Sequence, residues 1–309
     1  MTRPPHPGAP RLLDGGLATE LARSGEPVAE PWWTNKPLMV GAKRERLKRI
    51  HGDFLTAGAD VLTANTFRCN LRALDRLGFD PSAGMAWMVH AAVGAAEAAA
   101  RDRPDAEVVG SIGPVEDCYR PDAVPSDDDR LRAEHRWLAT ELRRCGIRTF
   151  LVETMNTVRE ARIAVEEVVA VGGVPWVGFV CGDGAALLSG EPLAAAAEAV
   201  GEAGAELVCV NCTDVGRTET ALRSLRASFS GAIGAYPNIE DRRPGTPPGE
   251  GPLPTAVTPA AFADTLTRWH GEFGLALLGG CCGTSPAHTA ALGRALRGEP
   301  AAAARGAAG

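Results

Sequence analysis

Short apolar segments of strand length alternate along this chain with longer segments of helical period. The short segments are rich in Val, Ile and Leu, whereas the longer ones combine Ala and Leu with Arg and Glu at helical spacing. The pattern predicts strands at 11–14, 60–65, 107–111, 149–153, 175–180, 206–211, 231–235 and 275–279. It predicts helices near 43–57, 84–101, 128–145, 157–171, 192–203, 217–228, 259–271 and 285–297.

This number of strand–helix units in 309 residues is typical of an α/β protein of the (β/α)8 or TIM barrel type. A doubly wound open sheet is the alternative, but its first turn would normally carry a phosphate or dinucleotide fingerprint. The segment Asp14-Gly15-Gly16 is not such a fingerprint. We therefore predict a single barrel domain over residues 11–298, with a flexible N-terminus at 1–10 and a disordered Ala/Gly-rich tail at 299–309.

Polar and reactive residues gather where the predicted strands end. In a barrel of this type, the working residues lie at the carboxyl ends of the strands, on one rim. On this rim we expect Asp14, Gly15 and Gly16 at the end of the first strand and Glu153 at the end of the fourth. We also expect Asn211 and Cys212 at the end of the sixth strand, and Cys281 and Cys282 at the end of the eighth.

Three of the eight cysteines, Cys212, Cys281 and Cys282, are predicted to bind one metal ion. A disulfide between adjacent cysteines is strained, and the flanking glycines let both sulfurs face one point. Three thiolates that leave a fourth position open are typical of a catalytic Zn²⁺ site. The alternative is a set of buried apolar thiols, because free cysteine is among the most buried residue types.

The other five cysteines are interpreted as packing residues. Cys209 lies three residues before Cys212, so strand alternation predicts that it faces the helices and forms no redox Cys-x-x-Cys pair. Cys181 ends the fifth strand and could line the pocket, although we expect it to pack. The remaining cysteines have no partner at ligand spacing and are Cys69, Cys118 and Cys145.

The carboxylates of Asp14 and Glu153 have two possible uses at the rim. Two carboxylates that face a barrel mouth can bind a cationic amine. They could instead act as the acid and base of glycoside cleavage. The cysteine cluster favours the first use, because soft thiolates select zinc and thiol chemistry.

Charge and hydropathy exclude several classes of partner. The net charge is −6 and no basic stripe is present, so we expect no nucleic-acid partner. No apolar run reaches the roughly 18 residues of a membrane span. The N-terminus lacks the apolar region of a signal peptide, so we expect a cytoplasmic protein with reduced cysteines. No heptad or extended arm predicts an oligomeric state.

The chain resembles the homocysteine S-methyltransferase family along nearly its whole length. The matching segments are LLDGGLATEL at 12–21, AGADVLTANTF at 57–67, GSIGP at 110–114, VET at 152–154, DGAALLSGEPL at 183–193, VNC at 210–212, YPN at 236–238 and GGCCGT at 279–284. VNC followed by GGCCG is the specific part, because it carries the family's three zinc ligands.

The resemblance implies a (β/α)8 barrel in which Cys212, Cys281 and Cys282 bind Zn²⁺. It implies that Asp14 and Glu153 hold the amino group of the amino-acid substrate, and that the backbone at Gly15 and Gly16, with Asn211 close by, helps to form the pocket. We expect a methyl group to move from a sulfonium donor, S-methylmethionine or S-adenosylmethionine, to the thiolate of homocysteine, giving methionine. The alternatives are a different thiol acceptor and a non-catalytic zinc- or thiol-binding protein.

Two segments depart from the family pattern. The segment after GSIGP, at 115–129, is short and soon reaches an acidic run, and the segment after YPN, at 240–254, is long and rich in Arg, Pro and Gly. Both are expected at the rim, where the substrates meet. The sequence therefore predicts the chemistry more firmly than the donor or the acceptor.

Overall fold

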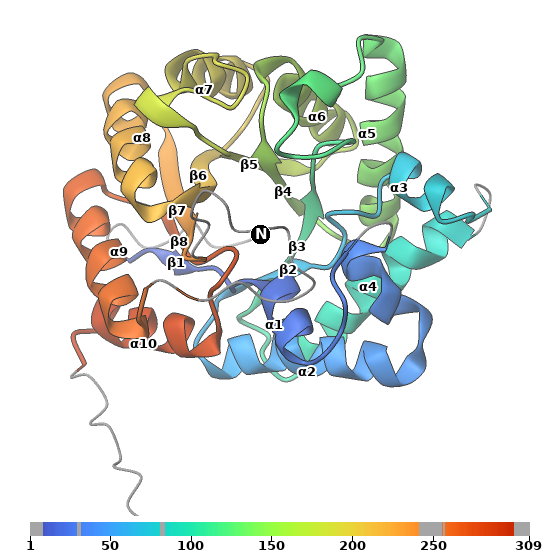
Figure 1. Ribbon diagram of the computed structural model, residues 1–309, viewed down its shortest axis with the longest axis horizontal. Coiled ribbons are helices and arrows are strands. Elements are labelled where there is room, and N and C mark those ends of the chain that lie inside the picture. The colour runs from blue at the N-terminus through green and yellow to red at the C-terminus, as the bar shows by residue number, and fades with distance from the viewer. Residues whose placement is uncertain (1–8, 30–31, 81–83, 241–254, 256, 300–309) are drawn as a thin grey trace, which may run out of the picture.

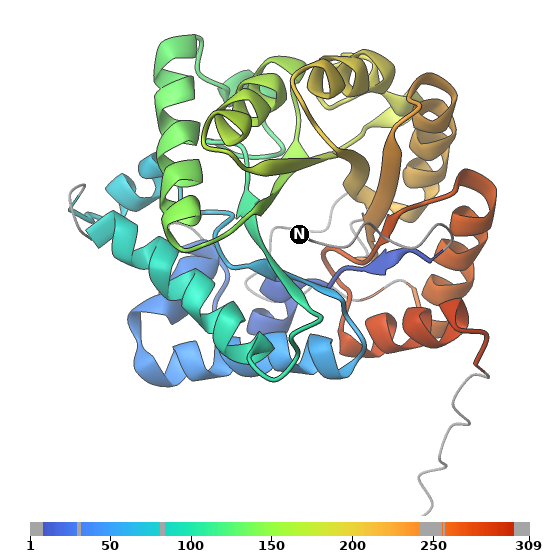
Figure 2. The same ribbon diagram turned by 180° about the vertical axis from the view of Figure 1, so that it is seen from behind.

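The computed structural model describes residues 9–29, 32–80, 84–240, 255 and 257–299. Within them, eight parallel strands form one sheet in the order β1-β8-β7-β6-β5-β4-β3-β2. The strands surround the centre and the helices form an outer ring (Figures 1 and 2). Most of the predicted terminal segments and of the 240–254 segment lies outside the described residues.

Every predicted strand is confirmed. The strands are β1 (Arg11–Leu12), β2 (Val61–Ala64), β3 (Glu107–Ile112), β4 (Thr149–Met155), β5 (Val174–Phe179), β6 (Leu207–Asp214), β7 (Ala232–Asn238) and β8 (Leu277–Leu278). The first and last strands are shorter than predicted, whereas β4, β6 and β7 continue beyond their predicted ends. The (β/α)8 barrel predicted from the pattern is therefore the fold of the chain.

The predicted helices are also confirmed. They are α2 (Gly41–Thr56), α4 (Gly84–Ala100), α5 (Asp128–Arg144), α6 (Val158–Ala170), α7 (Leu193–Glu202), α8 (Val215–Ser228), α9 (Pro259–Phe273) and α10 (Pro286–Leu296). The pattern missed the short elements α1 (Leu17–Arg23), α3 (Leu71–Arg76), η1 (Trp33–Met39), η2 (Pro121–Ala123) and η3 (Asp183–Ala185). They are too short for a helical period to be recognised. None of the described helices has the length and apolar character needed to cross a bilayer.

The sheet closes into a barrel between its first two strands. Leu13 pairs with Val61 in a single parallel bridge, and the amide of Asp14 donates to the carbonyl of Val61 at 3.0 Å. On its other side, β1 pairs with β8. The residues that follow β1 are thereby brought next to those that follow β8.

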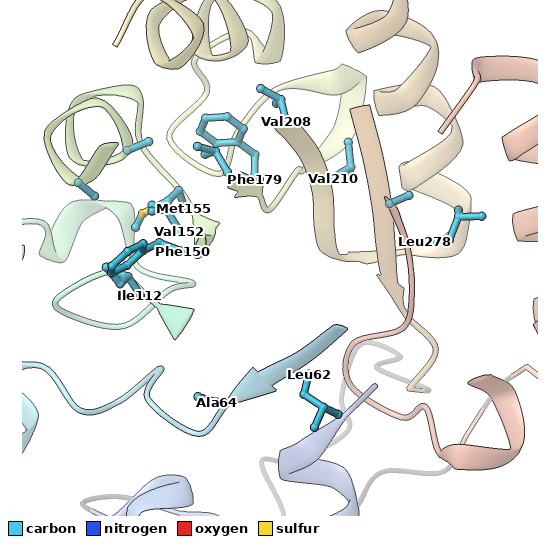
Figure 3. Packing of buried hydrophobic residues seen from close by; sticks show 14 of the residues in the cluster. Leu62, Ala64, Ile112, Phe150, Val152, Met155, Phe179, Val208, Val210 and Leu278 are labelled. Carbon is cyan, nitrogen blue, oxygen red and sulfur yellow. The ribbon is translucent and has the colours of Figure 1, made fainter. Parts of the chain in front are cut away.

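The strands are apolar on both faces. One face packs against the helices, and Figure 3 shows its side chains lying outward from the ring, among them Phe150 and Val152 of β4 and Val208 and Val210 of β6. The other face fills the barrel interior with a separate cluster, Leu13, Val61, Val109, Leu151, Leu207, Cys209, Tyr236 and Leu277. Burial on two sides is typical of parallel sheets and explains the near-continuous apolar strands.

The prediction that Cys209 faces the helices is wrong. Cys209 is fully buried in the interior cluster. The prediction counted back from Cys212 by strict alternation, but the pairing of β6 with β7 shifts register between Asn211 and Asp214. Such an irregularity changes the side to which the following residues point.

Replacing Phe150 by Ala tests the helix-facing layer. Phe150 has no exposed surface, and its ring lies against Val168 and the backbone of Gly173. We expect Phe150→Ala to lower the free energy of unfolding by about 3–5 kcal/mol in denaturant titrations. Val169→Ala, at a 44% exposed position of α6, should change it by less than about 0.5 kcal/mol. Equal effects of the two substitutions would contradict this view of the core.

Candidate metal and substrate site

Three cysteine sulfurs meet at the carboxyl end of the barrel. The Sγ atoms of Cys212, Cys281 and Cys282 all lie within 4.8 Å of one another, and each residue is half-buried. Hydrogen bonding with the Cys212 and Cys282 thiols, together with burial, raises the pKa of Cys281 well above its usual range. Ionisation of Cys281 beside the other two thiols is therefore unfavourable, and a cation between the sulfurs would favour it. A soft donor set of three sulfurs fits Zn²⁺, whose tetrahedral coordination takes one further ligand.

Cys212 owes its position to an irregular backbone. It follows Asn211 at the register shift in β6 and has a φ of +46°, which is uncommon for a residue other than glycine. Thr154, at the corresponding shift in β4, has a φ of +58°. Backbone strain of this kind persists only where the surroundings hold it in place.

The side chain of Asn211 holds both irregular segments. Its Oδ1 accepts from the amide of Thr154 at 3.1 Å, and its Nδ2 donates to the Thr154 hydroxyl at 2.9 Å. The side chain therefore bridges β6 to β4 past β5. Gly178 of β5 allows this, because a Cβ there would lie 2.7 Å from Asn211 Oδ1 and 2.5 Å from the Tyr236 hydroxyl. The sequence carries no signal for this role of Gly178.

Asn238 ties the two cysteine-bearing segments together. Its Oδ1 accepts from the amide of Cys282 at 3.0 Å, and its Nδ2 donates to the carbonyl of Cys212 at 3.0 Å. One amide side chain thus sets the spacing between β6 and the loop after β8. The only sequence signal for this role was the YPN segment, which did not reveal its contacts.

The glycines after β1 allow the cysteine loop to pack closely. A Cβ on Gly16 would lie 2.7 Å from the carbonyl oxygen of Cys281, and one on Gly15 would lie 2.8 Å from the Thr284 hydroxyl. The Gly16 amide donates to the Thr284 hydroxyl at 2.9 Å, and that hydroxyl donates to the Cys281 carbonyl at 2.7 Å. The DGG and GGCCGT segments thus form one packed unit.

Asp14 and Glu153 are buried carboxyl groups with raised pKa values. Asp14 accepts from the amide and the hydroxyl of Thr63, at 2.8 and 2.9 Å, and Glu153 accepts from the Ser111 hydroxyl at 2.5 Å. Burial raises the pKa of Asp14 to about 8, and the negative charge of Glu153 contributes to that rise. Burial likewise raises the pKa of Glu153 to about 7. Two buried carboxyl groups that repel each other when ionised favour a bound cation.

The barrel and the three-cysteine group match a known class of methyltransferase enzymes. The family model described as homocysteine S-methyltransferase matches residues 11–296. The chain belongs to this family.

Similar proteins span nearly the same length. Homocysteine S-methyltransferase 4 of Zea mays is 29% identical over 94% of this chain and 90% of its own. Homocysteine S-methyltransferase YbgG of Bacillus subtilis is 28% identical over 89% of this chain and 90% of its own. The metallated crystal structure of the homocysteine methyltransferase MmuM from Escherichia coli shares the fold, with a TM-score of 0.78 at 24% identity, over 92% of this chain and 95% of that one.

Gly178→Ala tests the bridge between β6 and β4. The new methyl group must displace Asn211 and Tyr236, so we expect a loss of about 1–3 kcal/mol in unfolding free energy and weaker metal binding at Cys212. Gly52→Ala in α2 is the matched control, because no neighbouring side chain lies within 4 Å of the place that its new Cβ would take. The control should be neutral or stabilising by up to about 1 kcal/mol. Wild-type stability and metal affinity in Gly178→Ala would contradict the bridge.

The raised pKa of Asp14 predicts a pH-dependent stability of the metal-free protein. Between pH 4 and 8 the unfolded chain has lost the Asp14 proton, whereas the folded chain retains it, because its pKa is about 8. The free energy of unfolding should therefore fall across this window as pH rises. We expect Asp14→Asn to reduce this fall, leaving the part that the raised pKa of Glu153 causes up to about pH 7, and Asp122→Asn, whose carboxyl is exposed, to keep it in full. Parallel pH profiles for wild type and Asp14→Asn would disprove the assignment.

Proposed function

We propose that this enzyme transfers a methyl group from a sulfonium donor, S-methylmethionine or S-adenosylmethionine, to the thiolate of homocysteine, giving methionine. The observation that carries the proposal is the group of three sulfurs within 4.8 Å of one another, in the same barrel end as two buried carboxylates. Homocysteine as the acceptor is supported by the relatives, which are named homocysteine S-methyltransferases.

Cys212, Cys281 and Cys282 would hold Zn²⁺ at this site. When bound, Zn²⁺ makes a thiol substrate ionise at neutral pH, whereas a free thiol with a pKa near 8.5 is only a few per cent thiolate. Three cysteine thiolates leave the site with a net charge of about −1, so the substrate sulfur stays electron-rich. The sulfur donors of this chain therefore suit a nucleophilic thiolate.

Asp14 and Glu153 would bind the ammonium group of homocysteine. Both need a cationic partner to be ionised together at neutral pH. Asn211 has both amide atoms bound to Thr154, so we propose that it acts as a fixed wall of the pocket, next to Cys212. Gly15 and Gly16 would line the pocket with backbone, where a side chain would collide with Thr284 or the Cys281 carbonyl.

The transfer is a single displacement that balances in charge. The homocysteine thiolate attacks the methyl carbon, a new S–C bond forms, and the bond from that carbon to the sulfonium sulfur breaks. The electron pair stays with the donor sulfur, so an anion and a cation give two neutral thioethers. Ionising the thiol contributes roughly 2 kcal/mol, and aligning sulfur and carbon can contribute up to about 7–11 kcal/mol.

We also propose that the protein works in a reducing compartment, the cytoplasm. The eight cysteines, all of which lie in the described part of the chain, form no disulfide. Oxidation of the three clustered thiols would remove the ligands that the proposed chemistry needs.

Methionine formation from homocysteine and S-methylmethionine by zinc-loaded protein, measured by mass spectrometry, tests this function. We expect product that disappears on chelation. Cys282→Ser should lower zinc content and reduce turnover by more than about 10- to 100-fold, the loss caused by altering groups that merely orient ligands. Cys209→Ala is the matched control on the same barrel, and it should keep both zinc and turnover.

The outcomes separate the parts of the proposal. Wild-type zinc content and turnover in Cys282→Ser would show that the metal assignment is wrong. An absence of methionine from zinc-loaded wild type would mean that the acceptor is another thiol or the donor another compound. Testing S-adenosylmethionine and other thiols would then identify which substrate differs.

A further inference from the structure

Arg68 is a buried cation near the barrel mouth. It lies in the segment after β2 and is only 9% exposed. Its guanidinium lies over the ring of Trp33 at 5.2 Å and over the ring of Phe67 at 5.1 Å. Both aromatic residues are half-buried, and both rings lie at a distance that stabilises the cation.

The charge of Arg68 has no counter-ion in the described part of the chain. Its Nη1 donates to the carbonyl of Glu116 at 2.7 Å, and its Nη2 approaches the Sγ of Cys118 at 3.8 Å. These partners are neutral, and they occupy two of the five N–H donors of a guanidinium. A buried charge is costly unless an opposite charge balances it. Arg68 therefore suits an anionic group that comes from outside the protein.

Cys118 connects Arg68 to the cysteine cluster. Burial raises the pKa of Cys118 to about 12; the charge of Arg68 opposes this rise, and the charges of Asp117 and Cys282 add to it. Arg68 and Cys282 therefore both lie within electrostatic reach of Cys118. Asn156 fixes the segment, because its Nδ2 donates to the Cys118 carbonyl at 2.9 Å. The segment of Arg68 also contacts the carboxyl side of the site, because the Thr66 hydroxyl donates to the Ser111 carbonyl at 2.7 Å and the Ser111 hydroxyl donates to Glu153.

We propose that Arg68 binds the carboxylate of the methyl donor and thereby selects sulfonium donors that carry one. The planar guanidinium matches a carboxylate with two parallel hydrogen bonds. A sulfonium compound without a carboxylate would bring a second positive charge beside an unbalanced one, and would be rejected. Asp14 and Glu153 suit an ammonium group and are already assigned to the thiol substrate. The proposal rests on the sulfonium donor of the proposed function.

Kinetics with two donors test the role of Arg68. Zinc-loaded wild type, Arg68→Gln and Arg68→Lys are compared with S-methylmethionine and with its carboxamide, which lacks the carboxylate. Arg68→Gln should raise the KM for S-methylmethionine by about 10- to 100-fold, with little change in kcat. The KM of Arg68→Lys should lie between those of wild type and Arg68→Gln. The carboxamide should react poorly with wild type and no worse with Arg68→Gln, because the substitution removes the charge that repels it.

Arg76→Gln is the matched control. Arg76 also contacts this loop, through Glu116 at 2.8 Å, but its side chain is 59% exposed. We expect wild-type kinetics from it. Zinc content and thermal unfolding of each variant show whether the site itself is intact.

Three results would overturn the proposal. One is an equal loss with both donors in Arg68→Gln. Another is a rise in the KM for homocysteine alone, which would assign the carboxylate to the thiol substrate. If wild type transfers no methyl group from either donor, the proposed function fails instead. The role of Arg68 is then tested by measuring the binding of both donors by calorimetry. The proposal is supported if wild type binds S-methylmethionine more tightly than its carboxamide and Arg68→Gln loses this preference. Equal binding of the two compounds by wild type would overturn the proposal.

Discussion

The closure of the barrel between Leu13 and Val61 is the constraint on which the site depends. This bridge and the pairing of β1 with β8 are short, yet they bring the start of the chain against its last strand. Asp14 and the two glycines after it then lie against the loop that carries Cys281 and Cys282. Side chains could not approach as closely as these glycines do, so the closure and the sequence at this point require each other.

The acidic groups at this end of the barrel are costly to ionise together. This end combines two buried carboxyl groups with three thiols, and their mutual proximity and burial raise the pKa of Asp14, Glu153 and Cys281. Protonation keeps these groups neutral, and bound cations would allow them to ionise. A metal ion and an ammonium group are the two cations that these ligands suit. Arg68 has the opposite imbalance nearby, a buried positive charge that suits an anion.

Local strain accompanies this arrangement. Thr154 and Cys212 both have a left-handed backbone, at strain energies of about 1–3 kcal/mol each. The amide side chain of Asn211 joins Thr154 to the strand of Cys212, and Asn238 joins Cys212 to Cys282. Two asparagine side chains therefore hold the geometry that the sulfurs need. Pre-organisation of this kind is what a site requires in order to bind metal and substrates in a fixed orientation.

The sequence by itself determined the (β/α)8 barrel, the rim at which the reactive residues gather and the three cysteines that meet there. Periodicity and position at a strand end are local properties, and the barrel rule places all such ends together. Only the tertiary structure decided that Cys209 faces the interior, because a register shift in β6 breaks the alternation from which its direction was predicted. It alone gave Gly178, Asn238 and Arg68 their places. Their contacts join residues far apart in the chain, such as Asn238 with Cys282 and Arg68 with Cys118, and no local pattern encodes such pairs.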